Sequence, residues 1–404
     1  MKKLLVIGII ILLIGVSVAP SIAINVVKIK SSTQSSLIGN TLYVGGSGEG
    51  NYSSIQRAIY DASDGDTVFV FDDSSPYIEW DILIDKSINL IGEDRNTTII
   101  DGYNSGVIIK INSCSNVIIQ GFTIKDGGYK YLENIIILID SCNNCIISNN
   151  FLDNSESLEG VRSTDGVCLI ESNNVQITNN IIFNGRSIIL RKSNDNIIAH
   201  NKLLDAQIIL EGSSNNNNIS YNVLANDYYG IELYNSNYNT LCYNNIVNIK
   251  WDGLVTFRSS NCEIYMNNIE NCKGSGIRID ECSDNIIHYN NIKRNRFGIY
   301  LVGHEGSFYS NNFINNFINV FTQDVGEYFF DGNYWNKPMN RPKMLIGLRT
   351  IWLRPPYTWG PHDHGWSINF PKILFDMNPA QEPYDINVPQ YYDITDYFGK
   401  NDIS

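Results

Sequence analysis

Asparagine recurs along this chain at a nearly fixed interval. Pairs or near-pairs of polar residues that end in Asn recur, and the later intervals are 21, 21, 23, 23, 23 and 21 residues. Each marker follows a short apolar stretch and precedes another, which predicts a strand, a turn and a second strand. A repeat of this length restricts the chain to a stacked architecture. The markers are Asn150, Asn180, Asn201, Asn222, Asn245, Asn268, Asn291 and Asn312.

A third strand is expected upstream of each marker, where Gly often opens a run of alternating apolar residues, as at Gly230, Ile231 and Leu233. Alternation places those side chains inside. The sequence therefore predicts an all-β fold: a single-stranded, right-handed parallel β-helix, or solenoid. Asn tolerates left-handed backbone geometry at bends, and coils about 4.8 Å apart bring equivalent amides into register. We expect Asn245, Asn268, Asn291 and Asn312 to occupy equivalent turn positions.

A solenoid exposes its core at both ends and needs caps. Ser53 is expected to cap a helix whose apolar face holds Ile55, Ala58, Ile59 and Ala62, and which covers the first coil. Early strands are expected at 67–71, 82–84, 87–91 and 98–100. After Trp335 the repeat stops, and residues 336–404 are rich in Pro and aromatic residues. They predict an irregular C-terminal cap.

Residues 1–23 combine Lys2 and Lys3, an apolar run and small residues, the layout of a secretory signal peptide. The alternative is an uncleaved membrane anchor. Residues 24–40 then form a linker and residues 41–335 one β-helix domain. Both readings place the body outside the cell, secreted or at the cell surface, and we expect a monomer.

The formal net charge is −13. Clustered Lys and Arg are needed to grip a phosphate backbone, so nucleic acid is not an expected partner. An acidic surface can bind neutral sugars, or anionic ones through Ca²⁺.

Eight cysteines occur, but their spacing does not fix a disulfide pattern. Cys142 and Cys145 form a lone CxxC without a second pair, so buried or stacked thiols are expected in place of zinc. Cys114 and Cys142 each precede by two residues the Asn that opens a strand. They are expected on adjacent coils.

Three stretches, 54–68, 86–93 and 98–102, resemble the opening of NosD-like β-helix proteins, and Gly332 to Trp335 resembles the end of that helix. The resemblance covers about 41–335. It implies a right-handed parallel β-helix of a kind common in archaeal secretomes and related to the domain shared by carbohydrate-binding proteins and sugar hydrolases. NosD itself is associated with copper-site maturation of nitrous-oxide reductase, a role that similarity of fold does not transmit.

Outward positions of the Gly-led strand, and those just before it, predict a strip of acids, guanidinium groups and rings along one side. Rings pack on the C–H faces of sugars while carboxylates and Arg bond hydroxyls; the alternative is ordinary solvent-facing decoration. The candidate catalytic residues are Asp165, Asp205, Glu211, Glu232, Asp252, Arg278 and Asp280, and the candidate ligand-binding residues are Arg186, Arg191, Tyr228, Tyr229, Tyr234, Trp251, Phe257 and Tyr300.

Two reaction types fit such residues. Glycoside hydrolysis needs two carboxylates about 5 to 9 Å apart, for which Glu211 with Glu232, or Asp252 with Asp280, are candidates. A polysaccharide lyase needs Ca²⁺-binding carboxylates beside a basic residue, such as Asp252 with Arg278 or Asp165 with Arg186. Because any acidic solenoid offers such pairs, the sequence leaves open whether the protein is an enzyme.

His362 and His364 form a His-x-His segment that is either half of a Cu or Zn site or part of a loop in the C-terminal cap. The sequence thus favours an extracellular β-helix that binds, and in one reading processes, a polysaccharide or cell-surface glycan. The alternatives are a noncatalytic cell-surface or adhesion spacer and a NosD-like copper accessory protein.

Overall fold

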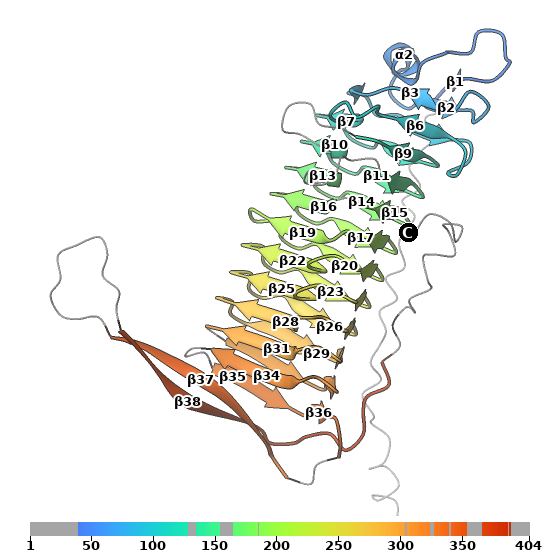
Figure 1. The fold of residues 1–404 in the computed structure, drawn as a ribbon. Coiled ribbons are helices and arrows are strands. Elements are labelled where there is room, and N and C mark those ends of the chain that lie inside the picture. Colours follow the sequence, from blue (N-terminus) through green and yellow to red (C-terminus); the bar gives the residue numbers. More distant parts are fainter. Residues whose placement is uncertain are drawn as a thin grey trace, which may run out of the picture. The chain divides into compact units, whose positions relative to one another are not determined.

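The chain folds as an all-β parallel solenoid with one short helix (Figure 1). The computed structural model describes residues 39–127, 135–153, 165–184, 186–303, 305–323, 327–338, 341–353, 366–386 and 388. The expectations for residues 1–23, for most of the linker and for His362 and His364 lie outside the described residues. Among the described residues no helix is both long enough and apolar enough to span a membrane.

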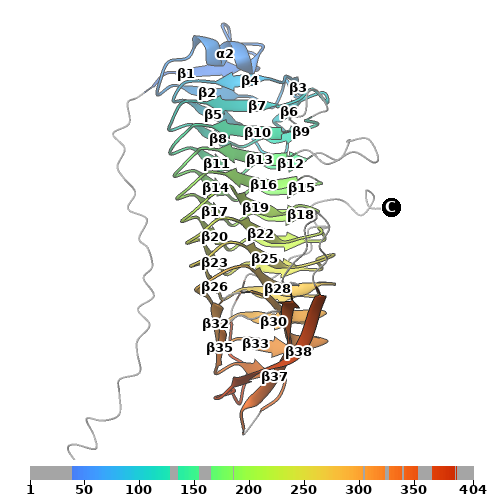
Figure 2. The same cartoon turned by 90° about the vertical axis from the view of Figure 1, so that its left-hand side faces the viewer.

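Each coil contributes three strands, which stack in parallel columns through register-matched pairs (Figure 2). The first column comprises β4 (Ile82–Ile84), β7 (Ile109–Asn112), β10 (Ile135–Asp140), β13 (Asp165–Ile170), β16 (Arg186–Arg191), β19 (Ile208–Glu211), β22 (Ile231–Tyr234), β25 (Leu254–Phe257), β28 (Ser275–Asp280), β31 (Phe297–Val302) and β34 (Ile318–Gln323). The second comprises β1 (Thr41–Val44), β2 (Thr67–Val70), β5 (Asn89–Gly92), β8 (Ile118–Gln120), β11 (Ile146–Ser148), β14 (Gln176–Thr178), β17 (Ile197–Ala199), β20 (Asn218–Ser220), β23 (Thr240–Cys242), β26 (Glu263–Tyr265), β29 (Asn285–His288), β32 (Glu305–Tyr309) and β35 (Glu327–Asp331).

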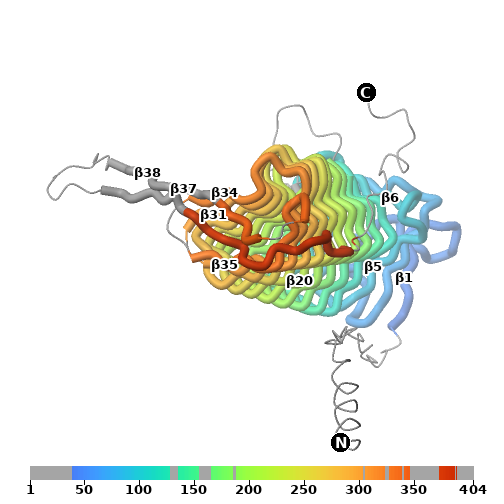
Figure 3. The backbone as a smooth tube through the Cα atoms, turned by 90° about the horizontal axis from the view of Figure 1, so that it is seen from below, coloured from blue at the N-terminus to red at the C-terminus, as the bar shows by residue number. Residues whose placement is uncertain are grey.

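The third column is a sheet of 12 strands. It comprises β3 (Tyr77–Ile78), β6 (Ile99–Asp101), β9 (Thr123–Lys125), β12 (Phe151–Asp153), β15 (Ile181–Phe183), β18 (Lys202–Leu204), β21 (Val223–Ala225), β24 (Asn245–Val247), β27 (Asn268–Glu270), β30 (Asn291–Lys293), β33 (Asn312–Ile314) and β36 (Tyr334–Trp335). Seen from below, successive coils have similar outlines and follow one another in regular steps (Figure 3). The observed early strands match the predicted ones to within about two residues, a normal uncertainty at strand ends.

The interior of the coils is filled by Ile, Leu and Val. Ile231 and Leu233 are completely buried, as the alternation predicted, and so are their partners one coil away, Ile208 and Leu210. Burial of this apolar surface is the main stabilising contribution to folding.

A ladder of buried Asn side chains runs along the turn before the third column. From Asn150 to Asn311, each Nδ2 donates to the Oδ1 of the Asn on the next coil, at 3.0 to 3.2 Å, and to a backbone carbonyl of the preceding coil. Its members are Asn150, Asn180, Asn201, Asn222, Asn244, Asn267, Asn290, Asn311 and Asn333.

The expected alignment of Asn245, Asn268, Asn291 and Asn312 is confirmed, since they pair in register. Their assignment to the turn is wrong: these four residues open strands of the third column, and the ladder runs through the residue before each of them.

The N-terminal cap is helix α2 (Ile55–Asp61), which buries Ile55, Ala58 and Ile59 as predicted. Its N-cap is Ser54 and not Ser53, because the Oγ of Ser54 accepts the N–H of Arg57. Glu79 adds a second cap: its two carboxylate oxygens accept the N–H groups of Ile55 and Gln56.

The C-terminal segment is more regular than predicted. Strands β37 (Lys343–Leu353) and β38 (Trp366–Asp376) form an antiparallel pair that joins β34 and β35 at Leu348 and Asp376. Beyond β38, Tyr384 exchanges two backbone hydrogen bonds with the side chain of Asn312, both 2.8 Å long. The chain therefore folds back along the last coils.

The thiols follow the sequence-based expectation. Cys142 and Cys145 are completely buried, and all eight cysteines are free. Cys114 and Cys142 lie on adjacent coils, because Asn112 pairs with Asp140 and Ser115 with Asn143.

Candidate functional site

A polar and aromatic patch occupies the outward face of the first column. Its base is one row of register-matched residues: Glu232, Val255, Arg278 and Tyr300. We use the name Glu232–Arg278 patch for this row with its polar neighbours Tyr229, Tyr234, Asp252 and Asp280. At about 4.8 Å per coil, the row spans about 14 Å.

Glu232 is a buried carboxyl of the patch, only 4% exposed. The hydroxyl of Tyr234, two residues along the same strand, donates to its Oε2 over 2.6 Å. Burial raises the pKa of Glu232, the bond from Tyr234 opposes this shift, and the charges of Asp227 and Asp252 reinforce it. Burial, followed by the bond to Glu232, raises the pKa of Tyr234.

Asp252 lies at the turn before β25 and is 7% exposed. Its Oδ1 accepts the backbone N–H of Ser275 on the next coil. A Cβ at Gly274 would lie 2.5 Å from this oxygen, so the close approach needs glycine. Burial and then the charges of Glu232 and Asp252 raise the pKa of Tyr229, against the opposing charge of Arg278.

Arg278 is held in place by two neighbours. Its Nη2 lies 3.0 Å from Asp280 Oδ2, and its guanidinium carbon lies 5.3 Å from the ring centroid of Tyr300. Burial lowers the pKa of Arg278, but the hydrogen bond and charge of Asp280 outweigh it and raise that pKa. The patch thus presents a fixed guanidinium two coils from a buried carboxyl.

Two exposed rings border the patch. Tyr228 is 57% exposed and Trp251 is 56% exposed. They lie on adjacent coils, because the N–H of Trp251 donates to the carbonyl of Tyr228. On the following coil the N–H of Gly274 donates to the carbonyl of Trp251, and glycine places no side chain beside the indole.

Lys250 Nζ lies 5.2 Å from the Tyr228 ring centroid and 3.8 Å from Asp205 Oδ1. Asp205 therefore lies near the exposed rings that border the patch. Burial raises the pKa of Asp205, against the opposing charge of Lys250.

The other predicted residues lie apart from this patch. Arg191 and Glu211 form a separate ion pair over 2.6 Å. Asp165 and Arg186 are in register on β13 and β16, where Asp165 is buried. Phe257 lies between Tyr234 and Asp280 in the neighbouring outward row and contacts the guanidinium of Arg258.

The register places Glu232 opposite Ile209 and Asp280 opposite Phe257. Neither Glu211 with Glu232 nor Asp252 with Asp280 is therefore directly opposed, and both pairs stay candidates. The predicted strip is also shorter, because the positions upstream of Glu232 in its row are the apolar residues Leu138, Cys168, Ile189 and Ile209.

A stack of rings that the sequence did not predict lies beside the Asn ladder. His200, Tyr221, Tyr243, Tyr265, His288 and Tyr309 follow one another with centroid separations of 4.7 to 5.9 Å. A ring one or two residues before each ladder Asn from Asn201 to Asn311 was the available signal. Because neighbouring rings in this stack cover one another, it offers sugars less open ring face than Trp251 does.

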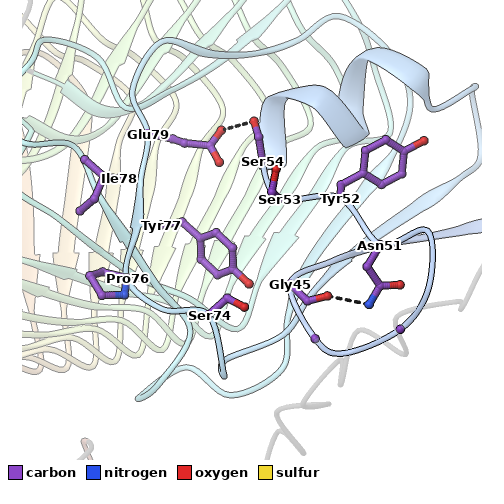
Figure 4. A pocket seen from close by; sticks show the side chains of 12 residues that line it. Gly45, Asn51, Tyr52, Ser53, Ser54, Ser74, Pro76, Tyr77, Ile78 and Glu79 are labelled. Carbon is purple, nitrogen blue, oxygen red and sulfur yellow. Dashed lines mark hydrogen bonds between the residues drawn. The ribbon is translucent and has the colours of Figure 1, made fainter.

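A separate pocket of about 580 Å³ lies at the N-terminal cap, between the Gly45 to Ser54 loop and the Ser74 to Glu79 segment (Figure 4). Its polar groups are already engaged: Glu79 caps α2, Asn51 donates to the carbonyl of Gly45, and Tyr77 donates to that of Phe71. We therefore assign it to the cap.

In the part of the chain that the structure describes, no three His, Cys, Asp or Glu side chains converge so as to hold a metal ion. His362 and His364, the candidate copper ligands, lie outside the described residues.

Fold and patch together define a parallel β-helix with an acid, guanidinium and aromatic surface on one face. The model of the family described as periplasmic copper-binding protein (NosD) matches residues 59–273 and 250–348. These ranges cover more than half of the chain, so the chain belongs to the NosD family. No curated protein sequence matches it.

Solved structures similar to the chain are β-helix proteins. The surface adhesin PfbA of Streptococcus pneumoniae aligns with a TM-score of 0.52 and 12% identity, covering 68% of this chain and 86% of the adhesin. The periplasmic alginate epimerase AlgG aligns at 0.45 and 14%, covering 65% and 72%. The catalytic domain of a GH87 alpha-1,3-glucanase in complex with nigerose aligns at 0.49 and 12%, covering 72% and 66%. At these identities the likeness concerns the fold.

Proposed function

We propose that the protein binds a polysaccharide along the Glu232–Arg278 patch. The observation that carries the proposal is the pair of exposed rings, Tyr228 and Trp251, beside a fixed guanidinium and several carboxyl groups. An open aromatic face packs on the C–H surface of a sugar ring, while charged groups form strong hydrogen bonds to hydroxyls. The row runs along the stack axis, a direction that suits an elongated chain of sugars.

The family description as periplasmic supports a location outside the cytoplasm. The finer assignment, secretion or attachment at the cell surface with residues 1–23 as signal peptide or anchor, is part of this proposal. Such a location gives the protein access to glycans of the cell envelope or the surroundings.

The test is affinity electrophoresis through gels that contain soluble β-glucan, arabinoxylan, galactomannan or polygalacturonate, each with Ca²⁺ or with a chelator. We expect retardation in at least one gel. Trp251→Ala should weaken binding at least about tenfold, because a stacked ring is lost. Trp80→Ala is the matched control, since Trp80 is 43% exposed but lies near the N-terminal cap.

Equal binding by Trp251→Ala and the wild-type protein would place the ligand elsewhere. Retardation in none of the four gels would favour the noncatalytic spacer.

A further inference from the structure

We infer that the hairpin of β37 and β38 binds the surface of a lipid bilayer that contains anionic phospholipids. The inference goes beyond the proposed function and does not rest on polysaccharide binding. It gives the hairpin two roles: its base joins the last coils, and its outer half meets lipid.

The hairpin extends beyond the strands that it joins. Strand β34 ends at Gln323, whose partner is Leu348, so the last five residues of β37 continue past it. In the described part of the chain, these five residues pair only with the first five residues of β38. Figure 1 shows the two strands leaving the stack of coils. We call residues 349–353 and 366–370 the outer half of the hairpin, which is about 17 Å long at about 3.4 Å per residue.

The outer half is largely apolar and contains no acid. Six of its ten residues are apolar, and two of these are Trp. The pairs are Arg349 with Phe370, Thr350 with Asn369, Ile351 with Ile368, Trp352 with Ser367 and Leu353 with Trp366. Trp together with aliphatic residues is typical of segments that lie at the interface of a membrane and water.

An exposed apolar face continues this character to the base of the hairpin. Met344, Ile373 and Phe375 are each 50 to 54% exposed, and Met344 is paired directly with Phe375. Phe329 of β35 is 60% exposed, and the register of β35 with β38 places it beside Phe375. The opposite face packs on the core through Leu345, which is 5% exposed. A contiguous exposed apolar surface of this kind marks an interaction site.

Charge distinguishes the hairpin from the chain as a whole. The formal net charge of the chain is −13, yet the two strands hold Lys343, Arg349 and Lys372 and a single acid, Asp376. Asp376 is completely buried and bonded to Asn333, so it presents no carboxylate to a partner. Basic residues beside an apolar surface attract anionic headgroups. They also disfavour a second copy as the occupant, because two hairpins in contact would bring like charges together.

The backbone of the outer half limits how deeply it can enter the bilayer. Backbone N–H and C=O groups at the edge of a two-stranded sheet need water, and the hydrocarbon interior supplies none. The outer half therefore lies in the interface and does not cross the bilayer. Its apolar side reaches about 5 to 10 Å into the boundary between headgroups and acyl chains.

The test is flotation with vesicles of phosphatidylcholine alone or of phosphatidylcholine and phosphatidylglycerol in equal parts. Residues 38–404 form one compact unit, so the chain is tested from Ile24 onward, without the apolar run of residues 4–18 that would itself bind lipid. We expect flotation with the anionic vesicles and much less with the neutral ones. Brominated lipid in the anionic vesicles should quench the Trp fluorescence of the unsubstituted chain.

The aromatic contribution is tested by Trp352→Ala combined with Trp366→Ala. The partition coefficient should fall at least about tenfold, because two large rings are lost from the interface. The matched control combines Trp80→Ala with Trp251→Ala, since both of these rings are exposed but lie on the coils.

The basic residues are tested by Arg349→Gln combined with Lys372→Gln. Binding to the anionic vesicles should fall at least about tenfold, because two charges near the headgroups are lost. Lys192→Gln combined with Arg294→Gln removes the same charge from exposed positions on the coils and should leave flotation within about twofold of the parent chain.

Four results would overturn the inference. They are no flotation and no quenching with either kind of vesicle, equal flotation with both kinds, equal losses in the hairpin variants and their controls, and a dimer in the absence of lipid that the two Trp substitutions dissociate. The last result would assign the hairpin to a second copy. Quenching in the unsubstituted chain tests the inference even where a variant fails to fold.

Discussion

Buried polar side chains of this protein differ in how many of their hydrogen-bonding groups have a partner. Asn267, in the middle of the ladder, donates from its Nδ2 to Asn290 and to the carbonyl of Leu241, and it accepts both the N–H and the amide of Asn244. Removing one member leaves partners on both neighbouring coils without a hydrogen bond. A buried polar group left unsatisfied costs about 1 to 3 kcal/mol.

Asn267→Ala is therefore expected to lower the free energy of unfolding by about 3 kcal/mol, measured by urea denaturation. Asn218→Ala is the matched control, because Asn218 is an exposed residue of strand β20. The expected loss for the control is below about 0.5 kcal/mol. Equal losses in the two variants would show that the ladder has no special contribution.

Glu232 illustrates the opposite case, a group whose burial disfavours its charge. Its folded pKa is raised, so between the unfolded and folded pKa values the folded state binds more protons than the unfolded state. Stability contributed by this group is therefore present at acid pH and is lost as pH rises through that window. Glu232→Gln should raise the melting temperature at pH 8 relative to the wild-type protein, and this advantage should shrink toward pH 4. A constant difference across this range would contradict the raised pKa.

In four coils the residue predicted from the sequence to occupy the turn lies one position after the Asn that does. In four coils the ladder Asn is followed directly by a second Asn, as at Asn244 and Asn245, so composition cannot say which of the two points inward. The register settles the choice: Val223 pairs with Asn245, so the residues before them, Asn222 and Asn244, are aligned in the ladder. The ring stack was missed for a related reason: its members change from the turn residue Tyr243 to the strand residue Tyr265, and only coordinates show that the rings still meet.

At the scale of elements, strand β38 ends the Asn ladder with a carboxylate. Asp376 is completely buried, and its Oδ2 accepts the N–H and the amide of Asn333 and the indole N–H of Trp335, over 2.9 to 3.1 Å. Asp376 is therefore the final acceptor of the ladder. Its carboxylate carries no N–H group that would need a further acceptor. This explains how a separate hairpin can close a stack built from Asn.

Asp376→Ala should destabilise the protein by about 2 to 4 kcal/mol, because three buried donors lose a charged acceptor. Asp376→Asn should cost less, since one oxygen can still accept. The two variants can be compared by their midpoints in urea. A larger effect of Asn than of Ala would show that the carboxylate is not the terminal acceptor.

Coil geometry determined how much of the patch could be predicted. The outward residues Glu232, Arg278 and Tyr300 follow from the alternation within their strands, so sequence identified them. Their neighbours across coils depend on register, and early coils differ in length from later ones: Cys114 to Cys142 is one coil of 28 residues, whereas Arg191 to Glu211 is one of 20. The sequence therefore predicted which residues face outward better than which of them meet.

The whole molecule depends on closing both ends of one continuous core. Buried Phe308, Phe313, Phe330 and Trp335 fill the last coils, with Phe313 stacked on Trp335 at 4.4 Å and Phe308 on Phe330 at 4.8 Å. We propose that residues 336–404 act as the C-terminal cap of the 41–335 helix and not as a separate domain. In support, Asp376 bonds Asn333, the N–H of Ala380 bonds the carbonyl of Asn333, and Tyr384 bonds Asn312 and the carbonyl of Gly332.

Truncation after Asn336 should remove all of these contacts at once. The strands β34 and β35 would gain free edges, which invite pairing with other chains, and the last coil would expose apolar side chains. We expect a lower melting temperature, or association detected by light scattering, whereas truncation after Val388 should leave both unchanged because it retains Asp376 and Tyr384. A monomer that melts like the full chain after truncation at Asn336 would show that the segment does not cap the solenoid.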